Sequence, residues 1–168
     1  MNAECFRFSD DGDVPNHPEW PAIYYPRAIE PGSGDSAVAF ETLFAANGWG
    51  NGWRNGIFSF IHYHSNAHEC LGIAKGQAIV RLGGKGGMDF TLSPGDVVLL
   101  PAGTGHQLIS SSDDLLVIGA YPPGADRDLM RSGEKDKQAI RQRVRAVPRP
   151  ATGPIFGAGD PMLAAWNT

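Results

Sequence analysis

The chain has 168 residues, of which 42% are hydrophobic and 19% are charged. This balance is typical of a globular protein with a core of its own. The formal net charge of -4 argues against nucleic acid or an anionic membrane surface as a partner. No apolar run is long enough to cross a bilayer, and the N-terminus lacks a secretion pattern. We therefore expect a single domain, 1–168, in a soluble, cytoplasmic protein.

The two cysteines, Cys5 and Cys70, lie far apart in the sequence. One is close to the N-terminus and the other is inside an apolar run, which is not the spacing of a disulfide framework. We expect both to be free thiols.

The first 35 residues are rich in Pro, Asp and Gly. They predict an extended arm, 1–35, in which the apolar run Ile23–Tyr25 forms one edge strand. His17, between Asn16 and Pro18, is expected to be a surface loop residue.

The segment that follows the arm predicts a short amphipathic helix. It begins at Asp35 or Ser36 and ends at Ala46, with apolar residues at helical spacing and a capping residue in front. A loop rich in Gly and Trp, 48–56, comes next. Its aromatic side chains either line a ligand cavity or cover the end of the core.

Short apolar runs broken by turn residues fill the next stretch and predict an antiparallel sandwich or barrel. Its core is expected over 54–121. The predicted strands are Ile57–His64, Glu69–Ala74, Gln77–Leu82, Met88–Leu92, Val97–Leu100, Gln107–Ser110 and Leu115–Tyr121.

The last part of the chain changes in composition. The segment 126–149 holds eight of the fourteen Lys and Arg residues, and its apolar residues at helical spacing predict a C-terminal helix with a solvated basic face. Acidic residues are mixed in, so we do not expect a nucleic-acid site. The Gly- and Pro-rich tail, 150–168, is expected to pack along the barrel.

Four of the five histidines lie in two short runs, 62–68 and 95–106. Strand alternation places His62 and His64 on the same face of the predicted strand, pointing inward. Burying two imidazoles without partners is costly, so we interpret them as ligands of a metal ion. His106 joins them from a distant strand.

Either His68 or Glu69 can face inward, because adjacent strand residues point to opposite faces. We choose Glu69, since Leu71 and Ile73 then continue an apolar stripe. His68 and Cys70 fall on the opposite face, although a bulge at the start of the strand would let His68 support a metal ligand or contact a substrate. The resulting set of His62, His64, Glu69 and His106 suits one divalent metal ion such as Zn, Fe, Mn or Ni.

These two runs resemble the two motifs of the cupin superfamily. Gly56, His62, His64, Glu69 and Gly76 have the spacing of the first motif, and Gly95, Pro101, Gly103 and His106 have that of the second. Ser110 stands where the second motif usually has Asn. Over its full length the chain resembles a group of small bacterial YjlB-like cupins.

The resemblance implies an all-β double-stranded β-helix, or jelly-roll barrel, with one metal held by the four ligands above and commonly a homodimer. A complete ligand set has little structural purpose in a barrel that is already packed, which favours a metal-dependent enzyme acting on a small metabolite, of dioxygenase, isomerase, decarboxylase or hydrolase type. A metal-containing module that binds or senses a small molecule without turnover is the alternative. A third class is a protein whose metal only holds the barrel together. No general base is evident; Trp53, Arg54, Tyr63 and Gln77 are nearby in sequence, with Tyr63 expected to face outward.

Overall fold

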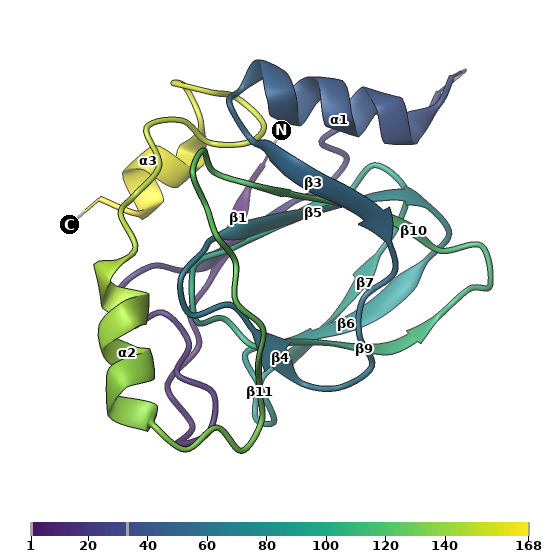
Figure 1. Ribbon diagram of the computed structural model, residues 1–168. Helices are drawn as coiled ribbons and strands as arrows, with labels where there is room; N and C mark the ends of the chain where they lie inside the picture. Colours follow the sequence, from purple (N-terminus) through teal and green to yellow (C-terminus); the bar gives the residue numbers. More distant parts are fainter. Residues whose placement is uncertain (1, 33, 168) are drawn as a thin grey trace.

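The structure is a computed structural model that describes residues 2–32 and 34–167. Its strands form two antiparallel sheets that face each other, with helices on the outside (Figure 1). The first sheet has the order β1 (Glu4–Phe6), β2 (Ala22–Tyr25), β8 (Val97–Leu100), β5 (Glu69–Lys75), β10 (Leu116–Tyr121) and β3 (Gly50–Asn55). The second has the order β11 (Met130–Arg131), β4 (His62–Tyr63), β9 (His106–Ser111), β6 (Ala78–Leu82) and β7 (Met88–Leu92).

The strands β5 to β10 confirm the predicted all-β jelly-roll architecture. Each agrees with a strand expected from the sequence to within one residue at either end. The predicted first helix is also confirmed: α1 (Ser36–Ala46) begins after Asp35, whose side chain accepts hydrogen bonds from two backbone amides of the first turn. Within the described residues, no helix is long and apolar enough to span a bilayer.

The segment around the histidine strand differs from the prediction. Only His62–Tyr63 is a strand, whereas Ile57–His64 was expected. The chain before β4 is irregular and meets β9 through single hydrogen bonds, such as Leu108 N to Phe58 O at 2.9 Å. The predicted Gly- and Trp-rich loop instead contains β3, which pairs with β10. Its glycines hide the alternation by which strands are recognised.

The N-terminal arm contributes two strands, not one. The run Ile23–Tyr25 belongs to β2, which lies between β1 and β8, so the expected edge strand is an interior one and β1 forms the edge. His17 is only 7% exposed, so its assignment to the surface was wrong.

The predicted C-terminal helix, 126–149, is shorter than expected. α2 covers Lys137–Ala146, where Asp136 caps its first turn, and β11 precedes it. Gly133 has a φ of +90° and interrupts the backbone between them. The tail contains a further short helix, α3 (Pro161–Ala165).

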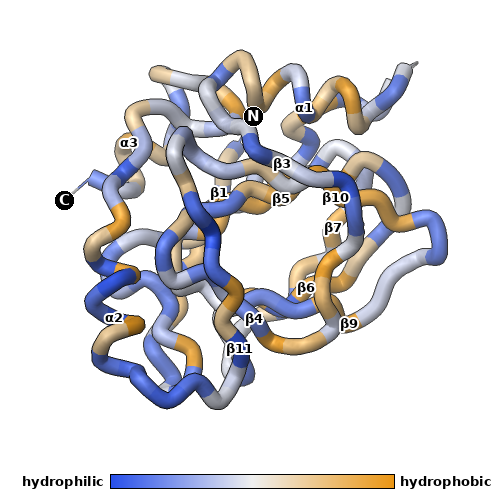
Figure 2. The backbone as a smooth tube through the Cα atoms, in the orientation of Figure 1, coloured by the Kyte–Doolittle hydropathy of each residue, from blue (hydrophilic) through white to orange (hydrophobic). Residues whose placement is uncertain are grey.

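Apolar side chains fill both faces of the first sheet. One cluster lies between the two sheets and includes Leu71 and Ile73 of β5. The other lies between the first sheet, α1 and α3, and includes Cys70, Phe40 and other aromatic residues. Figure 2 shows the contrast between the hydrophobic strands around the interior and the mostly hydrophilic α2. Cys5 and Cys70 are both free, as predicted.

Candidate metal centre

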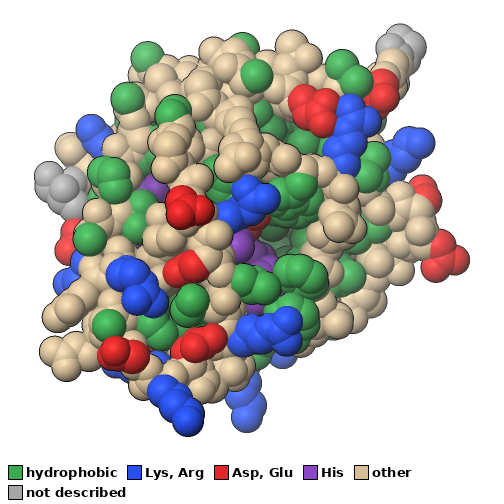
Figure 3. Space-filling view, in the orientation of Figure 1, with side chains coloured by type: hydrophobic (Ala, Val, Ile, Leu, Met, Phe, Trp, Pro, Cys, Tyr) green, Lys and Arg blue, Asp and Glu red, His purple; other side chains and the backbone are tan. Residues whose placement is uncertain are grey.

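The two sheets bring three of the four predicted ligands together. His64 follows β4, His106 opens β9, and Glu69 opens β5 in the opposite sheet. His64, Glu69 and His106 each offer a ligand atom, and these atoms all lie within 4.8 Å of one another. Figure 3 shows histidine side chains at the bottom of a hollow whose rim includes hydrophobic side chains and Lys or Arg side chains.

His62 lies beside this group but is not part of it. It pairs with His106 across β4 and β9, and the centroids of the two rings are 4.0 Å apart. His62 is 4% exposed and lines the same cavity as the other three residues. Its role as a fourth ligand stays a prediction.

The three imidazoles are held by backbone carbonyl groups. Nδ1 of His62 lies 3.0 Å from Phe60 O and Nδ1 of His106 lies 3.0 Å from Thr104 O. Nδ1 of His64 contacts the carbonyl of Asp128. A carbonyl only accepts hydrogen bonds, so each Nδ1 carries the proton and each Nε2 of the neutral rings presents a lone pair. This is the tautomer that metal-binding histidines use.

The carboxylate of Glu69 is buried among these lone pairs. Its Oε2 lies 3.2 Å from Nε2 of His64 and 3.2 Å from Nε2 of His106, but no well-aligned hydrogen bond reaches it from the described residues. Three acceptors at this separation repel one another unless a proton or a metal cation lies between them. The donor set therefore fits a divalent cation with nitrogen and oxygen ligands.

Without a metal, the carboxylate and the imidazoles shift each other's protonation. Burial raises the pKa of Glu69, but the adjacent His106 and His64 outweigh it and hold the pKa below its usual value. Burial lowers the pKa of His64, and the contact with Glu69 outweighs it and raises that pKa overall. Burial, with the neighbouring His106, lowers the pKa of His62 to about 3. The shifts of these two histidines therefore have opposite directions: contact with Glu69 favours the protonated form of His64, and burial disfavours that of His62.

Two residues outside the motifs orient Glu69. The hydroxyl of Tyr121 donates a hydrogen bond of 2.5 Å to Glu69 Oε1 and accepts one of 2.7 Å from Trp53 Nε1. These two consecutive hydrogen bonds occupy Oε1 of Glu69 and leave its Oε2 directed at the histidines. Gly119 permits it, because a Cβ at this position would lie 2.2 Å from the indole of Trp53.

A cavity of about 380 Å³ opens over the four predicted ligands. Arg127, Asp128 and Leu129, from the segment after β10, form part of its wall. The guanidinium of Arg127 lies 4.3 Å from the ring centroid of Tyr121, and Nη1 donates to Asn51 O. Asp128 accepts hydrogen bonds from the backbone and the hydroxyl of Ser65.

Sequence reasoning missed Tyr121, Arg127 and Asp128. Tyr121 stands at the end of a predicted strand, and its inward direction could have been found by counting alternation along that strand. Arg127 and Asp128 were included in the predicted helix 126–149. The contacts of this segment depend on how it crosses the barrel, for which the sequence has no local signal.

The other candidates lie outside the cavity, apart from Trp53. His68 is on the opposite face, as the choice of Glu69 requires: its Nδ1 accepts from Ala102 N and its Nε2 donates to Pro148 O. Tyr63 faces away from the interior as expected, although it is fully buried beside Ile140 of α2.

Arg54 forms an exposed ion pair with Glu41. Gln77 bonds the hydroxyl of Ser93. Trp53 lines the cavity, whereas Trp49 is buried in the core, so each alternative for the aromatic loop holds for one of its tryptophans.

Comparison with known proteins supports the pattern of the motifs. A family described as "Cupin domain" matches residues 55–118. The "Uncharacterized protein YjlB" of Bacillus subtilis is 36% identical over 163 residues, which cover 97% of this chain and 96% of that protein.

Solved structures show weaker likenesses. An acireductone dioxygenase from Bacillus anthracis, with a cadmium ion in its active centre, is 16% identical, with a TM-score of 0.44 over 65% of this chain and 82% of that one. A cupin 2 domain-containing protein from Halorhodospira halophila is 14% identical, with a TM-score of 0.39 over 88% and 83%. Likenesses of this size carry no conclusion about activity.

Proposed function

Because the chain belongs to the cupin family, we propose that His62, His64, Glu69 and His106 hold one divalent metal ion, Zn, Fe, Mn or Ni. The observation that carries this proposal is the buried Glu69 Oε2, which faces the Nε2 atoms of two histidines at 3.2 Å without a well-aligned donor. When bound, a divalent metal with three imidazoles and one carboxylate supplies a Lewis acid with open coordination positions.

The surrounding residues favour a small anionic metabolite as the ligand. Three neutral imidazoles, one carboxylate and a divalent cation leave one net positive charge, and in the rest of the cavity wall the charges of Arg127 and Asp128 offset each other. Oppositely charged small molecules are attracted to such a site. Aromatic and apolar groups, including Trp53, Ile57 and Phe58, contribute to the remainder of the cavity wall. We therefore propose a metal-dependent enzyme acting on a small acid.

A module that binds or senses such an acid without turnover is the second candidate. One observation favours it: the two carboxylates of the described cavity wall are both engaged. Glu69 faces the histidines, and Asp128 is bonded to Ser65. Neither is free to act as a general base.

The role of His62 is tested by titrating metal-free protein with Co²⁺ and following its absorption spectrum. We expect His62→Ala to weaken binding by about tenfold or more and to change the spectrum, because a ligand is lost. His68→Gln is the control, since His68 lies on the opposite face of β5. Unchanged binding and spectrum in His62→Ala would remove His62 from the ligand set.

Turnover separates the two functions. Metal-loaded protein is incubated with oxalate and small 2-oxo acids in air, while oxygen consumption and products are followed by an oxygen electrode and NMR. The enzyme proposal predicts product formation that depends on the metal. Saturable binding without product would favour the sensing module.

Two further expectations stay predictions. The homodimer is tested by light scattering, and the cytoplasmic location by fractionation of the cells that produce the protein.

A further inference from the structure

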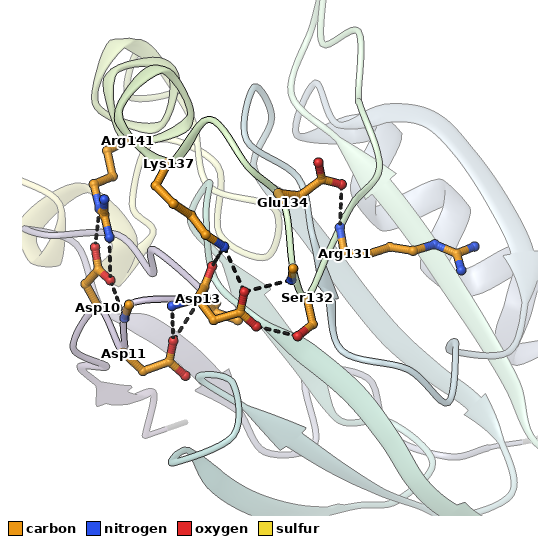
Figure 4. A network of polar contacts seen from close by, with 11 residues as sticks. Asp10, Asp11, Asp13, Arg131, Ser132, Glu134, Lys137 and Arg141 are labelled. Atoms are coloured by element: carbon orange, nitrogen blue, oxygen red, sulfur yellow. Dashed lines mark hydrogen bonds and ion pairs between the residues drawn. The ribbon is translucent and has the colours of Figure 1, made fainter.

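A second cavity lies away from the metal site, between the N-terminal arm and α2. Its volume is about 360 Å³, within the range of small-molecule sites. Phe8, Pro15 and Pro18 of the arm form apolar parts of its wall, and Val144 belongs to α2. Figure 4 shows the polar contacts at this junction of arm and helix.

Those contacts fix the two sides of the cavity to each other. Arg141 binds the carboxylate of Asp10 through two nitrogens, at 2.6 and 3.1 Å. Lys137 binds both the carboxylate and the backbone carbonyl of Asp13, at 2.7 and 2.8 Å. The walls are therefore held in place by residues of both elements, and the cavity does not depend on a single mobile side chain.

The charge of the cavity wall is positive. Arg7, Arg141 and Arg145 face a single carboxylate, that of Asp10. Because Arg141 already neutralises Asp10, the charges of Arg7 and Arg145 remain without a carboxylate in this wall.

His17 adds an unpartnered donor to the same wall. Its Nδ1 accepts hydrogen bonds from the backbone amides of Trp20 at 2.9 Å and Glu19 at 3.3 Å, so the ring proton lies on Nε2. That Nε2 is buried and has no hydrogen-bond partner within residues 2–32 and 34–167. A buried donor without an acceptor costs free energy. An acceptor is therefore what this position lacks.

His17 stays uncharged at neutral pH. Burial, with Arg145 and Arg7 nearby, lowers its pKa to about 4. It is stacked on Trp20, with centroids 4.4 Å apart, which fixes the direction of the ring. Nε2 is covered in this conformation, so a ligand reaches it only when the wall shifts. Arg7 and Arg145 are exposed side chains of that wall, and Nη1 of Arg7 donates to the backbone carbonyl of Glu19.

We propose that this cavity binds the phosphate group of a small phosphorylated compound, with Arg7 and Arg145 as charged donors and His17 Nε2 as a neutral donor. Two guanidinium groups and one neutral N–H in the same cavity wall suit the oxygens of a tetrahedral oxyanion. A cation is disfavoured by the positive wall. The apolar side chains of Phe8 and the prolines leave room for the rest of the compound.

The test uses zinc-loaded protein and inorganic phosphate as the probe, titrated against sodium chloride of equal ionic strength. NMR follows the imidazole resonances of His17, which report on this cavity alone and not on phosphate at the zinc ion. We expect a saturable shift of the His17 Nε2–H signal and slower exchange of its proton with water.

The variant Arg7→Gln with Arg145→Gln should weaken phosphate binding at His17 by about a hundredfold, roughly tenfold for each charged hydrogen bond. The matched control is Lys75→Gln with Arg149→Gln, which removes the same charge from exposed positions outside the cavity wall. It should bind as the unaltered protein does.

Three outcomes would overturn the proposal. The His17 signal does not shift beyond the effect of salt, or both double variants lose binding equally. In the third, acetate or citrate saturates the site more tightly than phosphate does, and the ligand is then a carboxylate. Because the readout is at His17, failure here leaves the metal proposal intact, and an empty metal site leaves this test unaffected.

Discussion

Replacing Tyr121 with phenylalanine removes the hydroxyl that orients the candidate metal ligand Glu69. The change deletes the 2.5 Å hydrogen bond to Glu69 Oε1 and the 2.7 Å bond from Trp53 Nε1, and it adds no bulk. A hydrogen bond to a charged group contributes about 1.5–3 kcal/mol. Released from it, the carboxylate can rotate and turn Oε2 away from the histidines.

We expect Tyr121→Phe to weaken metal binding by about 10–100-fold, the usual effect of losing a partner of a metal ligand. This equals about 1.4–2.8 kcal/mol, which agrees with the loss of one charge-assisted bond. The affinity is measured by competition between the protein and a chelator for Zn²⁺ or Mn²⁺. The protein should remain folded, because the ring still packs in the barrel.

The matched control is Tyr24→Phe. The hydroxyl of Tyr24 also donates to a carboxylate, Asp96 Oδ2 at 3.0 Å, but it lies outside the cavity wall. Metal affinity should be unchanged in this variant. Equal affinities of Tyr121→Phe and the unaltered protein, or equal losses in the two variants, would refute the role assigned to Tyr121.

Three further predictions concern stability and packing. Burial lowers the pKa of His68 to about 3. Between about pH 6.5 and pH 3, therefore, this histidine is protonated only in the unfolded state. As the pH is lowered through this range, the free energy of unfolding of the metal-free protein should fall by about 1.4 kcal/mol per pH unit because of this group. Denaturant unfolding at pH 7 and pH 5 should show that the free energy of unfolding depends less on pH in His68→Gln than in the unaltered protein. An equal pH dependence in the two proteins would contradict the lowered pKa of His68. Asp160→Ala should lower the free energy of unfolding by about 3 kcal/mol or more, because the buried carboxylate accepts hydrogen bonds from Tyr25 Oη and three backbone amides; a loss below about 1 kcal/mol in urea unfolding would be inconsistent with this network. Gly119→Ala should displace the indole of Trp53, change its fluorescence and weaken metal binding several-fold. Gly50→Ala should have none of these effects, because an added Cβ at Gly50 meets nothing within 4 Å. Identical behaviour of the two variants would count against the close approach of Trp53 to Gly119.

The sequence predicted the barrel strands well because their signals are local. Each of β5 to β10 is a short apolar or alternating run bounded by turn residues, and such runs form strands wherever a partner is available. The helix α1 was equally legible from its spacing and from the cap at Asp35. Burial on one face and a defined end are properties of a few neighbouring residues.

The errors lie where distant contacts decide the structure. β3 is a strand because it pairs with β10, where Gly119 lies opposite Trp53. The glycine-rich sequence of β3 has no local pattern that predicts this pairing. The predicted strand Ile57–His64 has an alternating pattern, but only His62–Tyr63 finds neighbours in β9 and β11. His17 looked like a loop residue, and it is buried because Trp20 and the arm fold over it.

In the candidate site, too, the sequence predicted some residues from local patterns and missed those whose positions depend on distant contacts. The spacing of the two motifs named His64, Glu69 and His106, which the structure brings within 4.8 Å. The groups that orient them, such as Tyr121 and the carbonyl of Asp128, come from segments whose positions depend on the closed barrel. Motif spacing identifies the candidate ligands, whereas their supporting contacts arise only from the fold.

The proposed metal site holds one ion per chain, at Glu69 and the neighbouring histidines. The most direct test is elemental analysis of the purified protein beside His62→Ala with His106→Ala and beside His68→Gln, each after incubation with Fe, Mn, Ni and Zn salts and removal of free metal. We predict one metal per chain in the unaltered protein and in His68→Gln, and almost none in the double variant. Absence of metal from the unaltered protein, or its retention in the double variant, would contradict the claim.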